Sequence, residues 1–181
     1  MDTVVTLTFK EVQHILTLGG CPSWSSKNRK AKACTYLVCT RNNSTRRPFY
    51  NGQDFHGFGF LIGQICGIEP TPERSMPSQP NLVKEIDPTR INIRIDKFAR
   101  IQVPELRQYV RAISGMAYRN PVHFVSMFDL PINPDALDWQ IVPPRDQQAI
   151  DTYNQFHTRQ RLDENRRRGK RISETEQCWF S

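Results

Sequence analysis

The most apolar stretch outside the N-terminal segment is Phe58–Ile68, which reads Phe-Gly-Phe-Leu-Ile-Gly-Gln-Ile-Cys-Gly-Ile. Its glycines disfavour a helix, because each costs about 1 kcal/mol relative to alanine in a helix interior. Its aromatic and branched side chains favour a pleated backbone, so we predict a buried strand. Glycines within a strand mark bulges, bends or close approaches to the backbone. Gly57, Gly59, Gly63 and Gly67 therefore predict a strongly curved sheet, and a ligand lying against this strand is the alternative.

Three more segments have the composition or the alternation of strands. Residues 33–41 are rich in aromatic and β-branched side chains. Within residues 90–98, isoleucine at 91, 93 and 95 alternates with polar residues, which is typical of a half-buried strand. Residues 120–126 fit a further short strand. Together with the glycine-rich strand, these segments predict the sheet of an α+β fold.

Apolar residues at helical spacing predict three helices. Thr8 and Glu11 fit a capping box, which would open an amphipathic helix of about ten residues. Residues 103–105, Val-Pro-Glu, open a second helix, because proline suits the first helical turn. The inner side of this helix is expected to consist of Leu106, Tyr109, Val110 and Ile113. A third helix begins at residues 144–146 and would bury Ile150, Tyr153 and Phe156.

Polar and proline-rich stretches separate these elements. Residues 21–32 are predicted to form a basic loop that contains Trp24. A tryptophan in such a loop is either a plug over the core edge or a stacking platform for a base. Residues 69–87 contain prolines at 70, 72, 77 and 80 and are predicted to form a second long loop. Loops of this length in a compact domain are commonly functional or mobile.

The length of 181 residues suits one domain with a sizeable core. We expect a single globular domain over residues 1–156 and a basic tail over residues 157–181. No apolar run approaches the 18 or so residues of a membrane span, and the N-terminus lacks the layout of a signal peptide. We therefore expect a cytoplasmic protein that does not contact a membrane, with its five cysteines reduced and mostly buried.

Positive charge is concentrated in two parts of the chain. The net charge is +7, yet residues 12–53 contain no Asp or Glu and carry seven cations, namely Lys27, Arg29, Lys30, Lys32, Arg41, Arg46 and Arg47. Residues 157–171 carry seven more against two acidic residues. Such clusters attract polyanions, above all nucleic acid, by releasing condensed counterions. A solvated surface that only keeps the protein in solution is the alternative.

Residues capable of catalysis or metal binding are scattered. The four histidines, at 14, 56, 123 and 157, form no pair with a cysteine or carboxylate at metal-ligand spacing. Cys34 and Cys39 would point to opposite faces of one strand, which argues against zinc. His56 beside Asp54 is the best catalytic candidate, although such a pair is more often a hydrogen-bonded turn. There is no phosphate-binding glycine loop and no nucleophile elbow, so we expect a non-catalytic protein without cofactor or metal.

The order of these parts resembles the PUA-like superfamily, specifically its EVE and YTH branch. A loop with Trp24 is followed by the glycine-rich strand and then by an alternating strand. A helix start reading Val-Pro-Glu-Leu-Arg at 103–107 comes next, and Asn-Pro-Val at 120–122 follows it. The resemblance covers about residues 21–141. The proline-rich loop and the lack of a second tryptophan beside Trp24 depart from the family pattern.

The resemblance implies a small, strongly curved mixed sheet closed like a β-barrel, flanked by short helices, that binds nucleic acid. Trp24 would stack on a modified or flipped base in an aromatic pocket, and Ser25 or Ser26 would hydrogen-bond the base edge. Basic residues on either side would hold the phosphates, namely Lys27, Arg29, Lys30, Arg46 and Arg47. Trp139 is the other aromatic candidate, but its apolar neighbours in the sequence favour core packing.

Two other functions stay open. The proline-rich loop and the apolar end at residues 178–180, Cys-Trp-Phe, fit a protein–protein adaptor whose charge only keeps it in solution. A nuclease with His56 and Asp54 at its site is the second alternative. The main expected partner is DNA or RNA, with a protein partner under the adaptor hypothesis. Salt dependence separates nucleic-acid binding from the adaptor hypothesis, because phosphate binding weakens steeply as salt rises and an apolar contact does not.

Overall fold

The computed structural model describes residues 1–8, 10–42, 56–71, 90–114, 122–153 and 155, without the side chains of residues 23–29 and 114. Its strands are β1 (Thr3–Thr8), β2 (Gly20–Ser25), β3 (Tyr36–Arg41), β4 (Gly59–Pro70), β5 (Arg90–Val103), β6 (Val122–Val125) and β7 (Gln140–Ile141). Its α-helices are α1 (Val12–Thr17), α2 (Leu106–Ser114) and a segment at residues 147–153. Three 3₁₀ helices are η1 (Ser26–Ala33), η2 (Met127–Asp129) and η3 (Pro134–Ala136).

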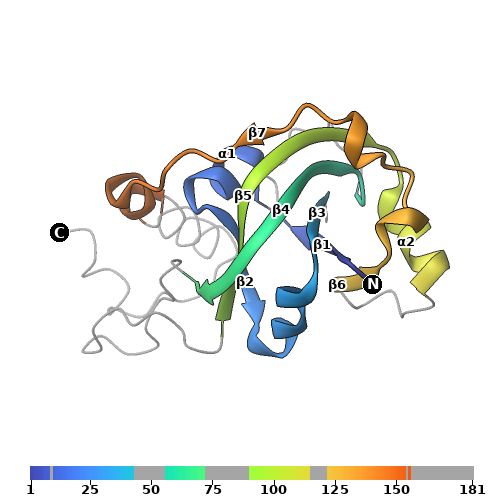
Figure 1. Ribbon diagram of the computed structural model, residues 1–181. Coiled ribbons are helices and arrows are strands. Elements are labelled where there is room, and N and C mark those ends of the chain that lie inside the picture. Colours follow the sequence, from blue (N-terminus) through green and yellow to red (C-terminus); the bar gives the residue numbers. More distant parts are fainter. Residues whose placement is uncertain (9, 43–55, 72–89, 115–121, 154, 156–181) are drawn as a thin grey trace, which may run out of the picture.

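The seven strands form one mixed sheet, which confirms the α+β class. The strand order is β2-β5-β4-β3-β1-β6, with β7 paired to β5. Only β1 and β3 pair in parallel among the strands described, and every other pairing is antiparallel. β4 and β5 run side by side as two long arcs (Figure 1). The predicted barrel-like closure is wrong, because β2 and β6 stand at the two ends of this order and the sheet stays open.

Two of the three glycines of β4, Gly59 and Gly63, lie where side chains come close to its backbone. The pairing of β4 with β5 shifts register at three places, between Gly59 and Leu61 and on both sides of Ile65. A Cβ atom at Gly63 would lie 2.7 Å from Cγ2 of Ile95, and one at Gly59 would lie 2.6 Å from Cδ2 of Leu106. Bulges and close approaches thus account for the curvature predicted from these glycines, and the approaching groups are side chains of this chain.

The N-terminal residues form a strand, and the predicted capping box is wrong. Val4 and Val5 are buried on opposite faces of β1, which lies between β3 and β6. Thr8 ends this strand, and its hydroxyl accepts from the Lys10 backbone N–H at 3.1 Å. Glu11 is the N-cap of α1 but makes no capping hydrogen bond through its side chain. The helix therefore begins at Val12 and is shorter than expected.

Two apolar layers cover the two faces of the sheet. The first surrounds α1 and η1, because Ile15 and Ala31 are buried against Leu37 and Ile93 of the strands. The second lies under α2 and the segment after β6, where Leu106 and Val110 are buried with nine other described residues, namely Val5, Val38, Ile62, Ala99, Ile101, Val125, Met127, Leu130 and Ile132. Leu37 and Val38, neighbours in β3, fall into different layers, as strand alternation requires.

The inner side of α2 is narrower than the sequence predicts. Leu106 and Val110 are fully buried, but Tyr109 is 45% exposed and Ile113 is 42% exposed, so these two assignments are wrong. Glu105 has a φ of 54°, and this left-handed turn delays the helix to Leu106. The third predicted helix is present at residues 147–153, and its Ile150 and Tyr153 pack on Leu18. Phe156 lies outside the described residues.

The predicted basic loop at residues 21–32 is instead strand β2 followed by η1. β2 pairs antiparallel with the first part of β5, with Gly20 opposite Arg94 and Ser25 opposite Arg90. The polar composition of β2 does not indicate a strand. Its pairing partner in β5 is some seventy residues away in the chain, so no local pattern predicts the pairing. Most of the proline-rich loop and the tail at 157–181 lie outside the described residues. Among the helices that the structure describes, none is long and apolar enough to cross a membrane.

Candidate nucleic-acid interface

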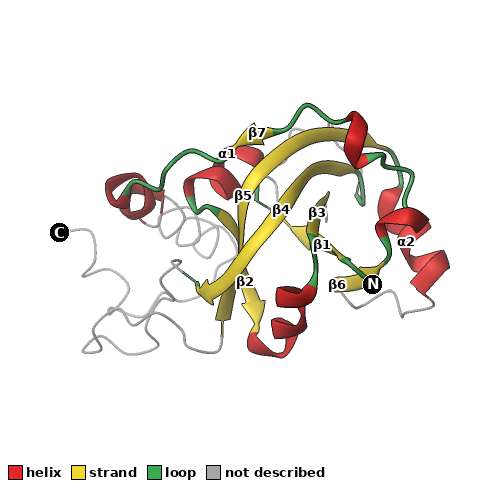
Figure 2. Cartoon of the chain, viewed as in Figure 1, coloured by secondary structure: helices red, strands yellow, loops and turns green. Residues whose placement is uncertain are grey.

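The residues predicted to hold a base and its phosphates are only partly described. Trp24 and Ser25 lie in β2 opposite Ile91 and Arg90, where β5 begins and β4 ends. Ser26, Lys27 and Arg29 lie in η1, which follows β2 directly (Figure 2). The structure describes the backbone of these five residues and not their side chains. Lys30 is described in full, and Arg46 and Arg47 lie outside the described residues.

η1 presents a basic surface that is anchored in the core. Ala31 is fully buried and Cys34, just after η1, is 7% exposed, while Lys30 and Lys32 are exposed. The Cys34 backbone N–H donates to the Ala31 carbonyl at 3.0 Å and closes the last turn. Burial, and then the Asp2 carboxylate, raise the pKa of the Cys34 thiol, which keeps it neutral in its apolar position. The backbone that carries Lys30 and Lys32 is thus anchored to the sheet.

Lys30 lies over an aromatic ring at the edge of the sheet. Its Nζ is 4.2 Å from the centroid of Phe124, a half-buried residue of β6. A cation this close to a ring face is attracted by the quadrupole of the ring. The free energy of this attraction is about 0.5–1 kcal/mol at exposed sites. The contact orients the ammonium without neutralising its charge. Positive charge is therefore placed beside β6 as well as along η1.

A second basic group lies at the far end of β3, and it consists of Lys10, Arg41, His56 and Arg107, termed here the Arg41 cluster. The Arg41 guanidinium carbon is 3.8 Å from the centroid of Phe60, and Nη1 donates to the Lys10 carbonyl at 3.3 Å. The Gly57 N–H donates to the Arg41 carbonyl at 2.8 Å, and the Arg107 N–H donates to the Gly57 carbonyl at 3.1 Å. Backbone hydrogen bonds thus join β3, β4 and α2 at this cluster.

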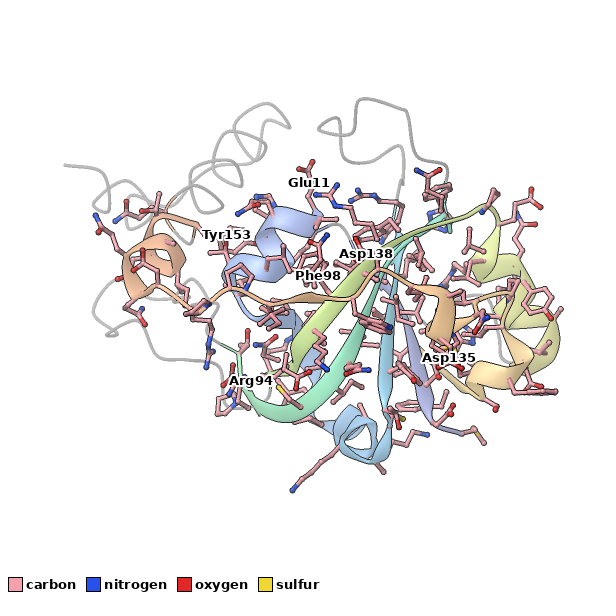
Figure 3. All side chains as sticks on the ribbon, turned by 45° about the horizontal axis from the view of Figure 1, so that its top comes forward. Glu11, Arg94, Phe98, Asp135, Asp138 and Tyr153 are labelled. Atoms are coloured by element: carbon pink, nitrogen blue, oxygen red, sulfur yellow. The ribbon has the colours of Figure 1, made fainter. Side chains whose placement is uncertain are left out.

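The other members of the Arg41 cluster are partly withdrawn from solvent. Arg107 is 4% exposed, and a Cβ at Gly57, whose φ is +89°, would lie 2.9 Å from the Arg107 Cβ. Burial, and then the positive charge of Arg107, lower the pKa of His56, so its imidazole is neutral at pH 7. The Lys10 ammonium donates to the Tyr153 hydroxyl at 2.7 Å. Tyr153 lies beside α1 in Figure 3, and its ring centroid is 4.8 Å from that of His14.

The two basic groups are attached at opposite ends of β3. η1 ends at Ala33, just before Tyr36 opens the strand, whereas Arg41 closes it. A six-residue strand has a length of about 17 Å. Arg46 and Arg47 lie outside the described residues. Within the part of the chain that the structure describes, η1 and the Arg41 cluster are therefore separated by the length of β3.

Trp139 is occupied in packing, as predicted. Its Nε1 donates to the Pro134 carbonyl at 2.9 Å. Its ring stacks on Tyr36, with centroids 6.2 Å apart and an interplanar angle of 27°. The side chain is half-buried against the apolar layer under α2. A hydrogen-bonded and stacked indole of this kind has little surface left for a base.

Other candidates for chemistry receive little support. In the described ranges no group of three or more His, Cys, Asp or Glu residues could hold a metal ion. Asp54, the proposed partner of His56, lies outside those ranges, as do residues 178–180 and most of the proline-rich loop. No protein-family model, no curated protein and no solved structure matches this chain. The function therefore has to be inferred from the geometry and charge of the chain itself.

Lys10 and Arg107 are basic residues that the sequence did not place near a site. Lys10 lay inside the predicted capping box, and Arg107 lay on a predicted helix far along the chain. They meet Arg41 because β1 pairs in parallel with β3 and because Gly57 joins β3 to α2. The sequence shows only a glycine at 57, which adopts its φ of +89° without strain, and this alone does not reveal the cluster.

Proposed function

We propose that this protein is a non-catalytic nucleic-acid-binding module whose binding surface consists of the basic η1 and the strand β2 before it. The observation that carries the proposal is the anchored, acid-free segment, in which exposed Lys30 and Lys32 flank the buried Ala31. Lysines fixed on a folded surface can match the spacing of phosphates, whereas the same charges on a mobile chain only raise the local field. Residues 12–53 contain no carboxylate to neutralise them.

The position of Trp24 supports a base-holding role within this proposal. The pairing of β2 with β5 shifts register between Cys21 and Trp24. Bulges of this kind re-aim side chains and are over-represented beside binding sites. Trp24 would stack on an unpaired base and Ser25 or Ser26 would bind its edge, as in the PUA-like domains of the EVE and YTH type that the sequence resembles. The curved mixed sheet with short helices is shared with what the resemblance implies, whereas the barrel-like closure that it also implies is absent from the described sheet.

The proposal is tested by fluorescence anisotropy with short single- and double-stranded DNA and RNA at about 50 and 200 mM salt. We expect binding that weakens by about 10- to 100-fold over this range, because several phosphates release counterions. A Lys30→Ala/Lys32→Ala variant should bind about 10-fold more weakly and show a shallower salt slope. Trp24→Ala should cost about 1–3 kcal/mol for single strands.

A charge-matched control decides whether η1 is the site. Lys97 and Arg100 are exposed residues of β5, and Lys97→Ala/Arg100→Ala removes the same net charge from a different part of the sheet. Affinity of this control should stay within about twofold of the parent. Equal losses in the two double variants would show that net charge alone attracts the polymer. Absence of binding to every probe at low salt would overturn the proposed function itself.

A further inference from the structure

Two cysteine thiols from strands that are not neighbours meet inside the first apolar layer. Cys21 belongs to β2 and Cys39 to β3, and both are fully buried in one cluster with Leu37, Leu61 and Ile93. In the strand order β5 and β4 lie between them. The two thiols nonetheless hydrogen-bond each other. Both residues are thiols rather than parts of a disulfide in this structure.

The curvature of the sheet brings these thiols together. Cys21 is opposite Ile93 of β5, which is itself opposite Ile68 near the end of β4. Cys39 is opposite Leu61 near the start of β4. Positions this far apart along β4 can meet only across the concave side of a strongly bent sheet. Three register shifts in the pairing of β4 with β5 supply the bend.

We propose that Cys21 and Cys39 are a site of oxidative modification, at which a peroxide or a small disulfide converts the two thiols into an internal disulfide. With hydrogen peroxide, the thiols lose two protons and two electrons, the S–S bond forms, and the peroxide is reduced to two molecules of water. The cross-link joins β2 to β3 and closes a loop of residues 21–39, which contains the whole of η1. Oxidation therefore fixes the path of the basic segment from both ends.

Burial makes this pair slow to react in the folded protein. The hydrogen bond with Cys21, and then burial, raise the pKa of the Cys39 thiol well above its usual value, so little of the reactive thiolate forms. β2 stands at one end of the strand order, and edge elements open more readily than central ones. Opening of β2 exposes Cys21 to the oxidant. The pair therefore stays reduced in a reducing compartment and cross-links under sustained oxidation.

The full chain is oxidised with hydrogen peroxide or diamide, digested with trypsin without reduction, and mapped by mass spectrometry. The expected product joins peptide 11–27, which holds Cys21, to peptide 33–41, which holds Cys39. Because Cys34 is in the same second peptide, the Cys34→Ala variant is treated in parallel and should give the same link. Cys21→Ala and Cys39→Ala should each abolish it. The melting temperature of the oxidised parent should rise by about 5–10 °C over that of the reduced parent.

A second arm removes the dependence on access to the core. The unfolded chain is refolded in a glutathione redox buffer, in which both thiols are exposed until the sheet forms, and is mapped in the same way. A 21–39 link in either arm supports the proposal. A link that requires Cys34, a failure to form any internal link in both arms, or a lower melting temperature after cross-linking would each overturn it. None of these readouts depends on nucleic-acid binding.

Discussion

Gly63 is a position in β4 where an added methyl group would meet several atoms of one buried side chain. A Cβ atom there would lie 2.7 Å from Cγ2, 2.8 Å from Cδ1 and 3.0 Å from Cβ of Ile95. Ile95 is 2% exposed, and its Cβ cannot move unless β5 moves with it. We expect Gly63→Ala to lower the free energy of unfolding by about 1–3 kcal/mol, because overpacking forces strands apart. Chemical denaturation measures this loss.

Gly67 offers a matched control in the same strand. A Cβ atom at Gly67 would meet nothing within 4 Å. Gly67→Ala should therefore leave stability unchanged or raise it by about 0.5 kcal/mol, since alanine restricts the unfolded chain. Equal effects at both positions would contradict the assignment of Gly63 to close packing and would leave general strand propensity as the cause.

Asp2 gives the stability of the protein an acid-sensitive contribution. Its Oδ1 accepts from the Met127 backbone N–H at 2.8 Å and from the Thr3 hydroxyl at 3.0 Å. Burial alone would raise the pKa of this carboxyl, but these hydrogen bonds outweigh it and lower the pKa below 3.8. The stabilisation is thus complete above pH 3.8 and is lost as the pH falls through the folded-state pKa.

Comparison with Asp2→Asn isolates this contribution. At pH 7 the variant should be less stable than the parent by about 0.5–1 kcal/mol, a modest value because the site is close to the surface. The difference should shrink below pH 4 and vanish near pH 2, as measured by urea denaturation across that range. A difference that stays constant with pH would show that the charge of Asp2 contributes nothing.

At the scale of elements, Glu69 joins the end of β4 to the segment that leads into the helix at 147–153. Its carboxylate accepts from both terminal nitrogens of Arg145, at 2.6 and 3.1 Å, and from the Asn92 amide at 2.9 Å. Arg94, labelled in Figure 3, has its Nε 3.8 Å from the same carboxylate. Asn92 also donates to the Leu18 carbonyl at 3.2 Å, close to the residues on which that helix packs.

Glu69→Gln should release this helix more than it destabilises the sheet. The substitution removes the bidentate ion pair with Arg145. Because the Glu69 side chain is 23% exposed and the Arg145 side chain 30% exposed, this pair contributes about 1 kcal/mol to local stability. Hydrogen exchange of the amides in residues 147–153 should quicken about 5-fold, while β3 and β4 keep their protection. Asp138→Asn, at an exposed carboxylate, should change neither rate. Uniform quickening across the sheet would contradict a local role for Glu69.

The elements that the sequence predicted well are those with a strong local pattern. β4, β5 and β6 follow from apolar composition and strand alternation, and Ile150 and Tyr153 follow from helical spacing. β1 was missed because Thr8 and Glu11 imitate a helix start, although their side chains make no reciprocal cap here. β2 was missed because a polar, basic strand is stabilised by its pairing with distant β5. Such pairing leaves no mark in the local sequence.

The candidate interface shows the same division between local and non-local signals. The acid-free composition of residues 12–53 identified η1 as a basic surface without knowledge of the fold. Its separation from Arg41 follows from the strand predicted at residues 33–41, because an extended strand holds its two ends apart. In the Arg41 cluster, tertiary hydrogen bonds join residues 10, 41 and 107 through Gly57, and no local sequence pattern reveals them. Positions in the sheet therefore decide which charges can act on one ligand.

At the scale of the whole molecule, β1 joins the early and late parts of the chain. It pairs in parallel with β3 and antiparallel with β6, so that Val5 lies opposite Val38 on one side and His123 on the other. The Asp2 carbonyl accepts from the N–H groups of Thr35 and Tyr36 at 2.6 and 3.1 Å. Because the last strand of this order depends on β1, the second apolar layer cannot close until residues 122–125 have docked.

A charge in the middle of β1 should therefore prevent the whole sheet from forming. Val5 is 2% exposed among apolar side chains, and Val5→Asp would bury a carboxylate without a partner. We expect loss of the cooperative thermal transition and of near-ultraviolet circular dichroism. Gln102→Asp, at an exposed position of β5, adds the same charge and should keep a transition within about 2 °C of the parent. Cooperative melting of Val5→Asp, with loss of hydrogen-exchange protection only in α2 and β6, would contradict this expectation. It would show that β1 and β6 form a separable unit and that the strands from β2 to β5 fold without them.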